Sequence, residues 1–127
     1  MSHRSSPNPT VLVCDDEDTL RSLIRATLSD YEIVEACDGD EALERARAVG
    51  PDLILLDMMM PGRSGLDVLT ELRRDEHLGS TPVVMLTARS QLADRDAAAA
   101  AGADRYLAKP FSPLQLIAVV DELLAGR

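Results

Sequence analysis

Short apolar runs alternate with amphipathic stretches along most of the chain. Five runs, bounded by polar or turn-forming residues, have the length and aliphatic character of buried strands. They lie at residues 10–14, 32–36, 52–57, 83–86 and 103–108. Apolar residues at helical spacing predict helices that end near residue 29 and span about 38–49, 64–74, 91–101 and 112–125. Strict alternation predicts an α/β fold with a parallel sheet, helices on both faces and right-handed crossovers.

Turn and capping signals support these boundaries and indicate one domain. Asp38-Gly39-Asp40 is typical of a helix N-terminus, whereas Gly50-Pro51 is typical of a helix end. Residues 1–9 are polar and contain serines and prolines, so we expect a flexible lead-in before a single domain at 10–127. The consecutive alanines at 97–101 give the fourth helix little apolar surface, so we expect it to be either mobile or small and tightly packed.

Composition and charge exclude several classes of function. The chain has 127 residues, of which 46% are hydrophobic and 28% charged, as in an ordinary globular domain. Its net charge of -9 argues against direct binding to nucleic acid. No apolar run approaches the roughly 18 residues of a membrane helix, and the first residues lack the apolar core of a signal peptide. Cys14 and Cys37 form neither a disulfide framework nor a metal-binding spacing, so we expect a cytoplasmic protein.

The third apolar run ends abruptly in a charge. Leu53-Ile54-Leu55-Leu56 is followed by Asp57 and then by a methionine-rich turn that ends in Pro61-Gly62. In parallel α/β sheets, ligands and reactive groups lie beyond the carboxyl ends of the strands. An aspartate at a strand end can also cap the following turn. Taken by itself, Asp57 suits a functional role and a capping role about equally well.

The other strand ends carry side chains with compatible chemistry. Asp15 and Asp16 follow the first strand, Thr87 follows the fourth and Lys109 follows the fifth. Lys109 is the only lysine among 13 basic residues, which suggests a place where a guanidinium cannot replace a compact ammonium. Because the carboxyl ends of parallel strands meet at one edge, we expect these groups to converge with Asp57.

Such a convergence suits phosphoryl transfer. Three neighbouring carboxylates repel one another unless a cation joins them. An oxygen-only ligand set with room for water favours Mg2+ over Ca2+. A carboxylate can act as the nucleophile, while a hydroxyl and an ammonium hold the phosphoryl oxygens. The strand ends therefore predict a Mg2+-dependent phosphoryl-transfer site.

From Thr10 to Ala125 the chain resembles the receiver domain of bacterial two-component response regulators. The matching motifs are Asp15-Asp16, Asp57 with Met60-Pro61-Gly62, Thr87-Ala88, Gly102-Ala103-Asp104 and Lys109-Pro110-Phe111. Each motif is weak alone, but together, in this order and at these intervals, they are highly specific. The resemblance implies a flavodoxin-like, doubly wound sheet of five parallel strands in the order 2-1-3-4-5, with five helices.

The resemblance also implies a role for each acidic residue. Asp57 would accept a phosphoryl group from a phosphohistidine on a sensor histidine kinase or a histidine phosphotransfer protein. Asp16, Asp57 and the backbone carbonyl of Met59 would bind Mg2+ directly, and Asp15 mainly through water. Lys109 would pair with the Asp57 carboxylate and then with the phosphoryl group. The domain would be a phosphoacceptor that assists its own phosphorylation and dephosphorylation, and no true enzyme.

A conformational switch is implied as well. Thr87 would move its hydroxyl onto a phosphoryl oxygen, and Tyr106 would turn inward behind it. This would change the surface of the fourth helix, the fifth strand and the fifth helix, which would bind a downstream protein or a second copy of the chain. Met59 and Arg89 stand at positions that tune the lifetime of the phosphoryl group. The Lys109-Pro110 bond is typically cis in this family.

Other interpretations stand beside a free-standing phosphorylation switch. The chain could be the receiver part of a longer DNA-binding or enzymatic regulator, since its last third resembles receivers attached to winged-helix transcription factors. A haloacid-dehalogenase-like phosphatase would carry a second acid two residues after the nucleophile, where this chain has Met59. A nucleotide-binding module is disfavoured because no glycine-rich loop follows a strand.

Overall fold

The computed structural model describes residues 8–88 and 94–125, which form five strands and five helices. The strands are β1 (Thr10–Cys14), β2 (Glu32–Ala36), β3 (Leu53–Asp57), β4 (Val83–Ala88) and β5 (Arg105–Lys109). The helices are α1 (Asp18–Thr27), α2 (Gly39–Val49), α3 (Gly65–Arg74), α4 (Asp94–Ala101) and α5 (Pro113–Leu124). Strands and helices alternate as the apolar pattern predicts.

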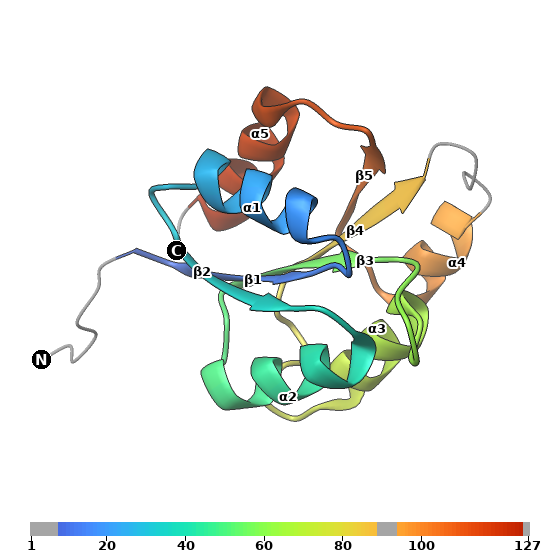
Figure 1. Cartoon of the computed structure of the whole chain (residues 1–127). Helices are drawn as coiled ribbons and strands as arrows, with labels where there is room; N and C mark the ends of the chain where they lie inside the picture. The colour runs from blue at the N-terminus through green and yellow to red at the C-terminus, as the bar shows by residue number, and fades with distance from the viewer. Residues whose placement is uncertain (1–7, 89–93, 126–127) are drawn as a thin grey trace, which may run out of the picture.

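All five strands lie parallel in one sheet, in the order β2-β1-β3-β4-β5. Helices α1 and α5 cover one face, and α2, α3 and α4 cover the other (Figure 1). The flavodoxin-like strand order 2-1-3-4-5 is therefore confirmed. The strand order reverses between β1 and β3, and open α/β sheets bind their ligands in the crevice at such a point. The carboxyl ends of these two strands lie side by side there.

Each face of the sheet has its own hydrophobic core. Along β1, Leu12 and Cys14 pack on the side of α2 and α3, whereas Val11 and Val13 pack on the side of α1 and α5. Every residue of β3 is buried, including Asp57 at its end. Because successive side chains point to opposite faces, a strand covered on both sides needs a continuous apolar run. The strands that carry the site are therefore held rigidly on both faces.

Local signals set most helix boundaries. The N-caps of α2, α3 and α5 are Asp38, Ser64 and Ser112, and each side chain accepts a hydrogen bond from a backbone N–H of the first turn. Helix α2 ends at Gly50, whose φ of 61° lies in the left-handed region that favours glycine. The Lys109-Pro110 peptide bond is cis, in agreement with the family resemblance.

Some boundaries differ from the predicted ones. Helix α1 ends at Thr27 because Leu28, with φ -99° and ψ 49°, already leaves the helical conformation. Strand β5 begins at Arg105 and not at Ala103, because the N–H of Ala103 bonds to the carbonyl of Ala98 and closes the end of α4. The 91–93 part of the predicted fourth helix and residues 1–7 of the predicted lead-in lie outside the described residues.

Helix α4 buries little of its surface. Among its side chains that the structure describes, only Ala98 is buried, whereas α3 buries Val68, Leu69 and Leu72. This thin contact is what the alanine run predicts. A polar contact also holds the end of α4. The guanidinium of Arg73 in α3 donates a hydrogen bond to the backbone carbonyl of Gly102 at 2.8 Å.

The two cysteines occupy contrasting places. Cys14, at the end of β1, is fully buried, and burial raises the pKa of its thiol. Cys37, directly after β2, is exposed. Both cysteines are free, as their spacing predicts.

Candidate functional site

Three carboxylates meet at the carboxyl edge of the sheet, where β1 and β3 end next to each other. Asp15, Asp16 and Asp57 each offer one carboxylate oxygen, and these oxygens lie within 4.8 Å of one another. Asp15 and Asp57 are buried, whereas Asp16 is exposed. The structure therefore brings together the three acids that the strand ends suggested, and it leaves one of them open to solvent.

Lys109, the last residue of β5, reaches this acidic cluster. Its Nζ lies 2.8 Å from Oδ2 of Asp15, 3.3 Å from Oδ1 of Asp57 and 3.7 Å from Oε1 of Glu17. Burial acts to lower the pKa of Lys109, but the hydrogen bond to Asp15 and the charges of Asp57 and Asp15 outweigh it and the pKa is raised. The ammonium thus stays charged and offsets part of the repulsion. Its shortest contact is with Asp15, whereas the family resemblance emphasised Asp57.

Asp57 is almost fully enclosed and its charge is only partly compensated. Its exposed fraction is 5%, and its Oδ1 accepts a hydrogen bond from the N–H of Met59 at 3.2 Å. This contact caps the following turn, so the capping role weighed for Asp57 is present together with the cluster. Burial first and the charge of Asp15 second raise the pKa of Asp57 to about 6, although Lys109 and the Met59 N–H oppose them. An added cation at this site would favour the ionised carboxylate.

The loop after β3 passes very close to Asp57. A Cβ placed on Gly65 would lie 2.2 Å from the carbonyl oxygen of Asp57, so a larger residue would push the start of α3 away. Met58 is buried, and Met60 packs against the same core. The side chain of Met59, in contrast, is 58% exposed. The backbone of this loop is therefore held in place while one of its side chains projects into solvent.

Thr87 stands on β4 next to the end of β3. The residue is fully buried, and its Oγ1 has no hydrogen-bond partner in the described parts of the chain. An unpaired buried hydroxyl costs about 1–3 kcal/mol, so a ligand oxygen that accepts its proton would be favoured. Tyr106 on β5 is partly buried against the core, and the guanidinium of Arg95 lies 5.0 Å from its ring centroid. Arg89 lies outside the described residues.

Sequence reasoning overlooked one arginine beside the cluster. Arg21 of α1 donates from Nη1 to the backbone carbonyl of Asp15 at 2.6 Å. No motif or spacing distinguishes Arg21 from the other arginines of the chain. Only the packing of α1 against the end of β1 brings the two residues together.

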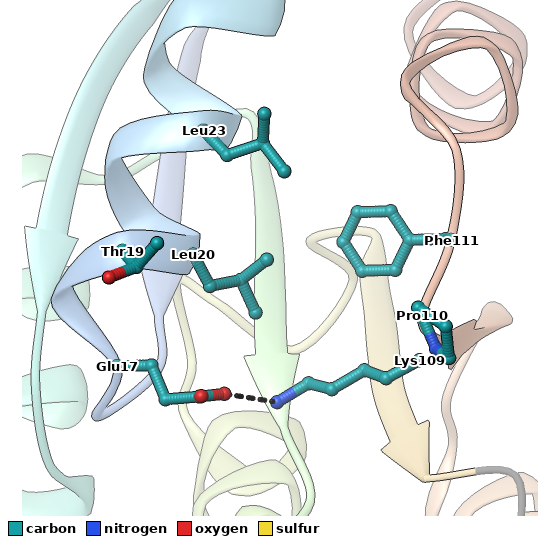
Figure 2. Close-up of a pocket in the computed structure, with 7 residues that line it drawn as sticks. All are labelled: Glu17, Thr19, Leu20, Leu23, Lys109, Pro110 and Phe111. Atoms are coloured by element: carbon teal, nitrogen blue, oxygen red, sulfur yellow. Dashed lines mark ion pairs between the residues drawn. The ribbon is translucent and has the colours of Figure 1, made fainter.

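A cavity of about 460 Å³ opens beside Lys109 (Figure 2). Its lining residues are Glu17, Thr19, Leu20, Leu23, Lys109, Pro110 and Phe111. The charged ends of Glu17 and Lys109 point toward each other, while Leu20 and Leu23 lie across the cavity from Phe111 (Figure 2). Phe111 is partly buried and packs against the core on the side of α1 and α5. Lys109 borders both this cavity and the acidic cluster, whereas none of the three clustered aspartates lines the cavity.

These features define the receiver class of α/β domain. The sheet is parallel and doubly wound, with paired acids after its first strand and a further acid at the end of its third. Residues 11–121 match the family model described as response regulator receiver domain. The chain belongs to this family, which is a class of two-component signalling domains and not of catalytic enzymes.

Individual relatives support the same assignment. The chain is 43% identical over 116 residues to the transcriptional regulatory protein ResD of Bacillus subtilis (strain 168), covering 90% of this chain and 47% of ResD. It is 47% identical over 122 residues to the transcriptional regulatory protein PrrA of Mycobacterium leprae (strain TN), covering 94% of this chain and 52% of PrrA. The chain thus spans about half the length of the curated relatives it matches.

A solved structure of similar shape is the chemotaxis response regulator CheY4 of Vibrio cholerae. The two chains share 32% identity with a TM-score of 0.87, and the match covers 92% of this chain and 99% of CheY4. Within the described residues, none of the helices has the length and apolar character needed to cross a membrane.

Proposed function

We propose that this domain is a phosphorylation-driven switch in which Asp57 accepts a phosphoryl group from a phosphohistidine on a sensor histidine kinase or a histidine phosphotransfer protein. The observation that carries the proposal is the meeting of three carboxylates with Lys109 at one edge of the sheet, next to a buried hydroxyl that lacks a described partner. We expect the protein to act in the cytoplasm, where such a phosphohistidine would be presented.

The donor set fits a Mg2+ ion. Asp15, Asp16 and Asp57 supply oxygen ligands only, and the exposure of Asp16 leaves space for water, which Mg2+ retains when it binds proteins. The backbone carbonyl of Met59 would complete the set on the protein side. When bound, Mg2+ supplies charge neutralisation for the phosphoryl oxygens. We expect Asp16 and Asp57 to bind it directly and Asp15, which already bonds to Lys109, to act mainly through water.

The residues of the chain divide the reaction among them. An oxygen of the Asp57 carboxylate attacks phosphorus, an O–P bond forms as the P–N bond of the donor breaks, and the released imidazole takes a proton from solvent. Burial keeps Asp57 poorly hydrated, and the Met59 N–H holds its Oδ1 in place. Lys109 lies near enough to transfer its contact from the carboxylate to a phosphoryl oxygen.

The signal would travel through Thr87. Donation of its hydroxyl to a phosphoryl oxygen would give the Thr87 Oγ1 a partner that exists only in the phosphorylated state. Tyr106 would then turn inward and change the surface of α4, β5 and α5. A nearly complete switch between two states needs about 5.5 kcal/mol of differential stabilisation. That surface would bind a downstream protein or a second copy of the chain, and we expect no direct binding to nucleic acid.

Intact-mass spectrometry after incubation with acetyl phosphate and Mg2+ tests the phosphoacceptor. The wild-type chain should gain one phosphoryl group, and Asp57→Asn should gain none. The exposed acid Asp67 of α3 provides a matched control, and Asp67→Asn should be modified like the wild type. Chelation of Mg2+ should prevent the modification. An unmodified wild type, or an equally modified Asp57→Asn, would contradict the proposal.

A second test separates acceptance of the phosphoryl group from the response to it. Thr87→Ala should still accept the group, but the NMR resonances of α4 should move much less on phosphorylation than in the wild type. Equal resonance shifts in the two proteins would refute the proposed role of Thr87.

The relatives favour a second form of the same function. ResD and PrrA are transcriptional regulatory proteins about twice as long as the matched segment. This chain would then act as the receiver part of a longer DNA-binding regulator, and the α4–β5–α5 surface would contact the remainder of that protein. The length of the native reading frame distinguishes this form from a free-standing switch.

A further inference from the structure

The acidic cluster depends on how the turn after β1 is held. Asp15 is fully buried, and its Oδ1 accepts the N–H of Glu17 at 2.9 Å while its Oδ2 accepts from Lys109 at 2.8 Å. Its own N–H donates to the carbonyl of Ala36 in β2 at 3.0 Å. The remaining polar group of Asp15 is its carbonyl oxygen, to which Arg21 donates. Every polar group of this residue is therefore occupied by the protein itself.

The contact with Arg21 fixes the peptide plane from which Asp16 departs. The carbonyl of Asp15 belongs to the peptide group that joins Asp15 to Asp16, and Nη1 of Arg21 lies 2.6 Å from its oxygen. Asp16 is the exposed acid of the cluster, and within the described residues no hydrogen bond or ion pair holds its carboxylate. Its direction toward the other two acids is therefore set through the backbone.

Arg21 is itself anchored by a second strand. Its Nε donates to Oε1 of Glu35 in β2 at 2.9 Å, its Nη2 pairs with Asp18, and its side chain is only 13% exposed. A guanidinium can make these contacts at once because its donors form a rigid planar fork. Arg25 pairs with the same Glu35, but its side chain is 60% exposed and its ion pair lies at the surface. The chain thus offers two arginines on one glutamate, of which only Arg21 bonds to Asp15.

We propose that Arg21 is a positioning residue of the Mg2+ site, acting on Asp16 through the backbone carbonyl of Asp15. The inference rests on the proposed function, because it concerns the metal site assigned there. Arg21 bonds to the backbone carbonyl of Asp15 and to the side chains of Glu35 and Asp18, and to none of the three clustered carboxylates. Its effect would therefore be on the geometry of the ligands. Groups that orient metal ligands typically change metal affinity by about 10-fold to 100-fold when they are removed.

The test is the dissociation constant for Mg2+, measured by titration calorimetry on the whole chain at neutral pH. Arg21→Ala should raise this constant by about 10-fold. Arg25→Ala, which removes the other partner of Glu35, should stay within about twofold of the wild type, since Arg25 makes no described contact with Asp15. Arg21→Lys should fall between them, because one ammonium can restore a single contact of the fork. Thermal unfolding of each variant checks that the titrated protein is folded.

The outcomes separate this inference from the proposed function. If the wild type binds Mg2+ and the Arg21→Ala and Arg25→Ala variants bind it with equal affinity, the positioning role is overturned. The metal site itself is then unaffected. A wild type that does not bind Mg2+ would overturn the metal site and the inference with it. Where Arg21→Ala does not fold, Arg21→Lys and Arg21→Gln decide, since an affinity equal to that of the wild type in both would also overturn the role.

Discussion

Asp57 and Thr87 lie at the carboxyl ends of adjacent strands, yet the protein treats their side chains in opposite ways. Both residues are buried. Oδ1 of Asp57 accepts the Met59 N–H and lies 3.3 Å from Lys109, so its charge is held from two sides. Oγ1 of Thr87 has no partner in the described parts of the chain. The side chain at the end of β3 is thus already held in place, whereas the hydroxyl near the end of β4 lacks a hydrogen-bond partner among the described residues.

The difference indicates a division of tasks between two regions. In the proposed reaction, the acid would stand in a defined position before a phosphoryl donor arrives, whereas the hydroxyl would gain a partner only from the delivered group. The packing of the helices follows the same division. Helix α3 starts directly over Asp57, where Gly65 leaves no room for a side chain. Helix α4, which comes after Thr87 in the chain, buries only Ala98 among its described side chains.

The largest effect on stability should come from removing the ammonium of Lys109, which lies beside Asp15 and Asp57. Lys109→Met should lower the free energy of unfolding at pH 7 by about 3–5 kcal/mol, because the fully buried carboxylate of Asp15 would lose its partner. Urea unfolding in the presence of a chelator measures this. Arg105→Met on the same strand is the matched control, since its pair with Glu122 is exposed to solvent and should contribute little to stability. An equal loss of unfolding free energy in the two variants would mean that the contacts of Lys109 contribute no more than an ordinary surface ion pair.

An intermediate effect should come from neutralising Asp57 itself. The folded-state pKa of about 6 lies above the unfolded value near 4, so the folded state keeps its proton longer. The stability that the raised pKa of Asp57 contributes is therefore complete below about pH 4 and is lost as the pH rises through about 6. At pH 7.5 without metal, Asp57→Asn should be about 3 kcal/mol more stable than the wild type.

Urea unfolding of Asp57→Asn and wild type from pH 4 to pH 7.5 measures this difference. The gap between the two proteins should widen as the pH rises, and Mg2+ should narrow it by stabilising the wild type. The exposed Asp67→Asn control should follow the wild type at every pH. If the unfolding free energies of Asp57→Asn and wild type changed in parallel with pH, burial would not disfavour the ionised form of Asp57.

The smallest effect should come from removing the unmet hydrogen bond. Thr87→Val keeps the shape of the side chain and replaces the unpartnered hydroxyl by a methyl group, which should raise the free energy of unfolding by about 1 kcal/mol. Thr87→Ser retains the hydroxyl but loses a methyl group, so it should be less stable than the wild type. A Thr87→Val variant that loses stability would mean that the hydroxyl already has a partner, and the contrast with Asp57 would disappear.

The sequence predicts the fold wherever local chemistry decides it. The aliphatic run before Asp57 is a strand because both faces of the sheet are covered, and Asp38 and Gly50 bound α2 because each satisfies backbone groups near at hand. The unusual lysine also leads to the site. Its preference for Asp15 could not be predicted, because that contact joins residues 94 positions apart and depends on side-chain packing.

Two further features depended on packing alone. Arg21 carries no local signal, and only the docking of α1 places its guanidinium on the carbonyl of Asp15. The start of β5 could not be placed from sequence either, because Ala103 has strand-like neighbours but its N–H bonds back to the carbonyl of Ala98. Long-range contacts of this kind decide which polar side chains complete a site once the strand ends have brought it together.

The contrast between the two cysteines gives the protein a single addressable thiol. Cys14 is sealed in the core, whereas Cys37 stands in solvent just beyond β2. A hydrogen bond to Glu41 raises the pKa of the Cys37 thiol, so maleimide labelling calls for a mildly alkaline solution. A fluorophore or spin label could be attached there in the unmodified sequence, outside the acidic cluster and at the same edge of the sheet. Movements of the distant α4 could then be followed by pairing this position with one engineered cysteine.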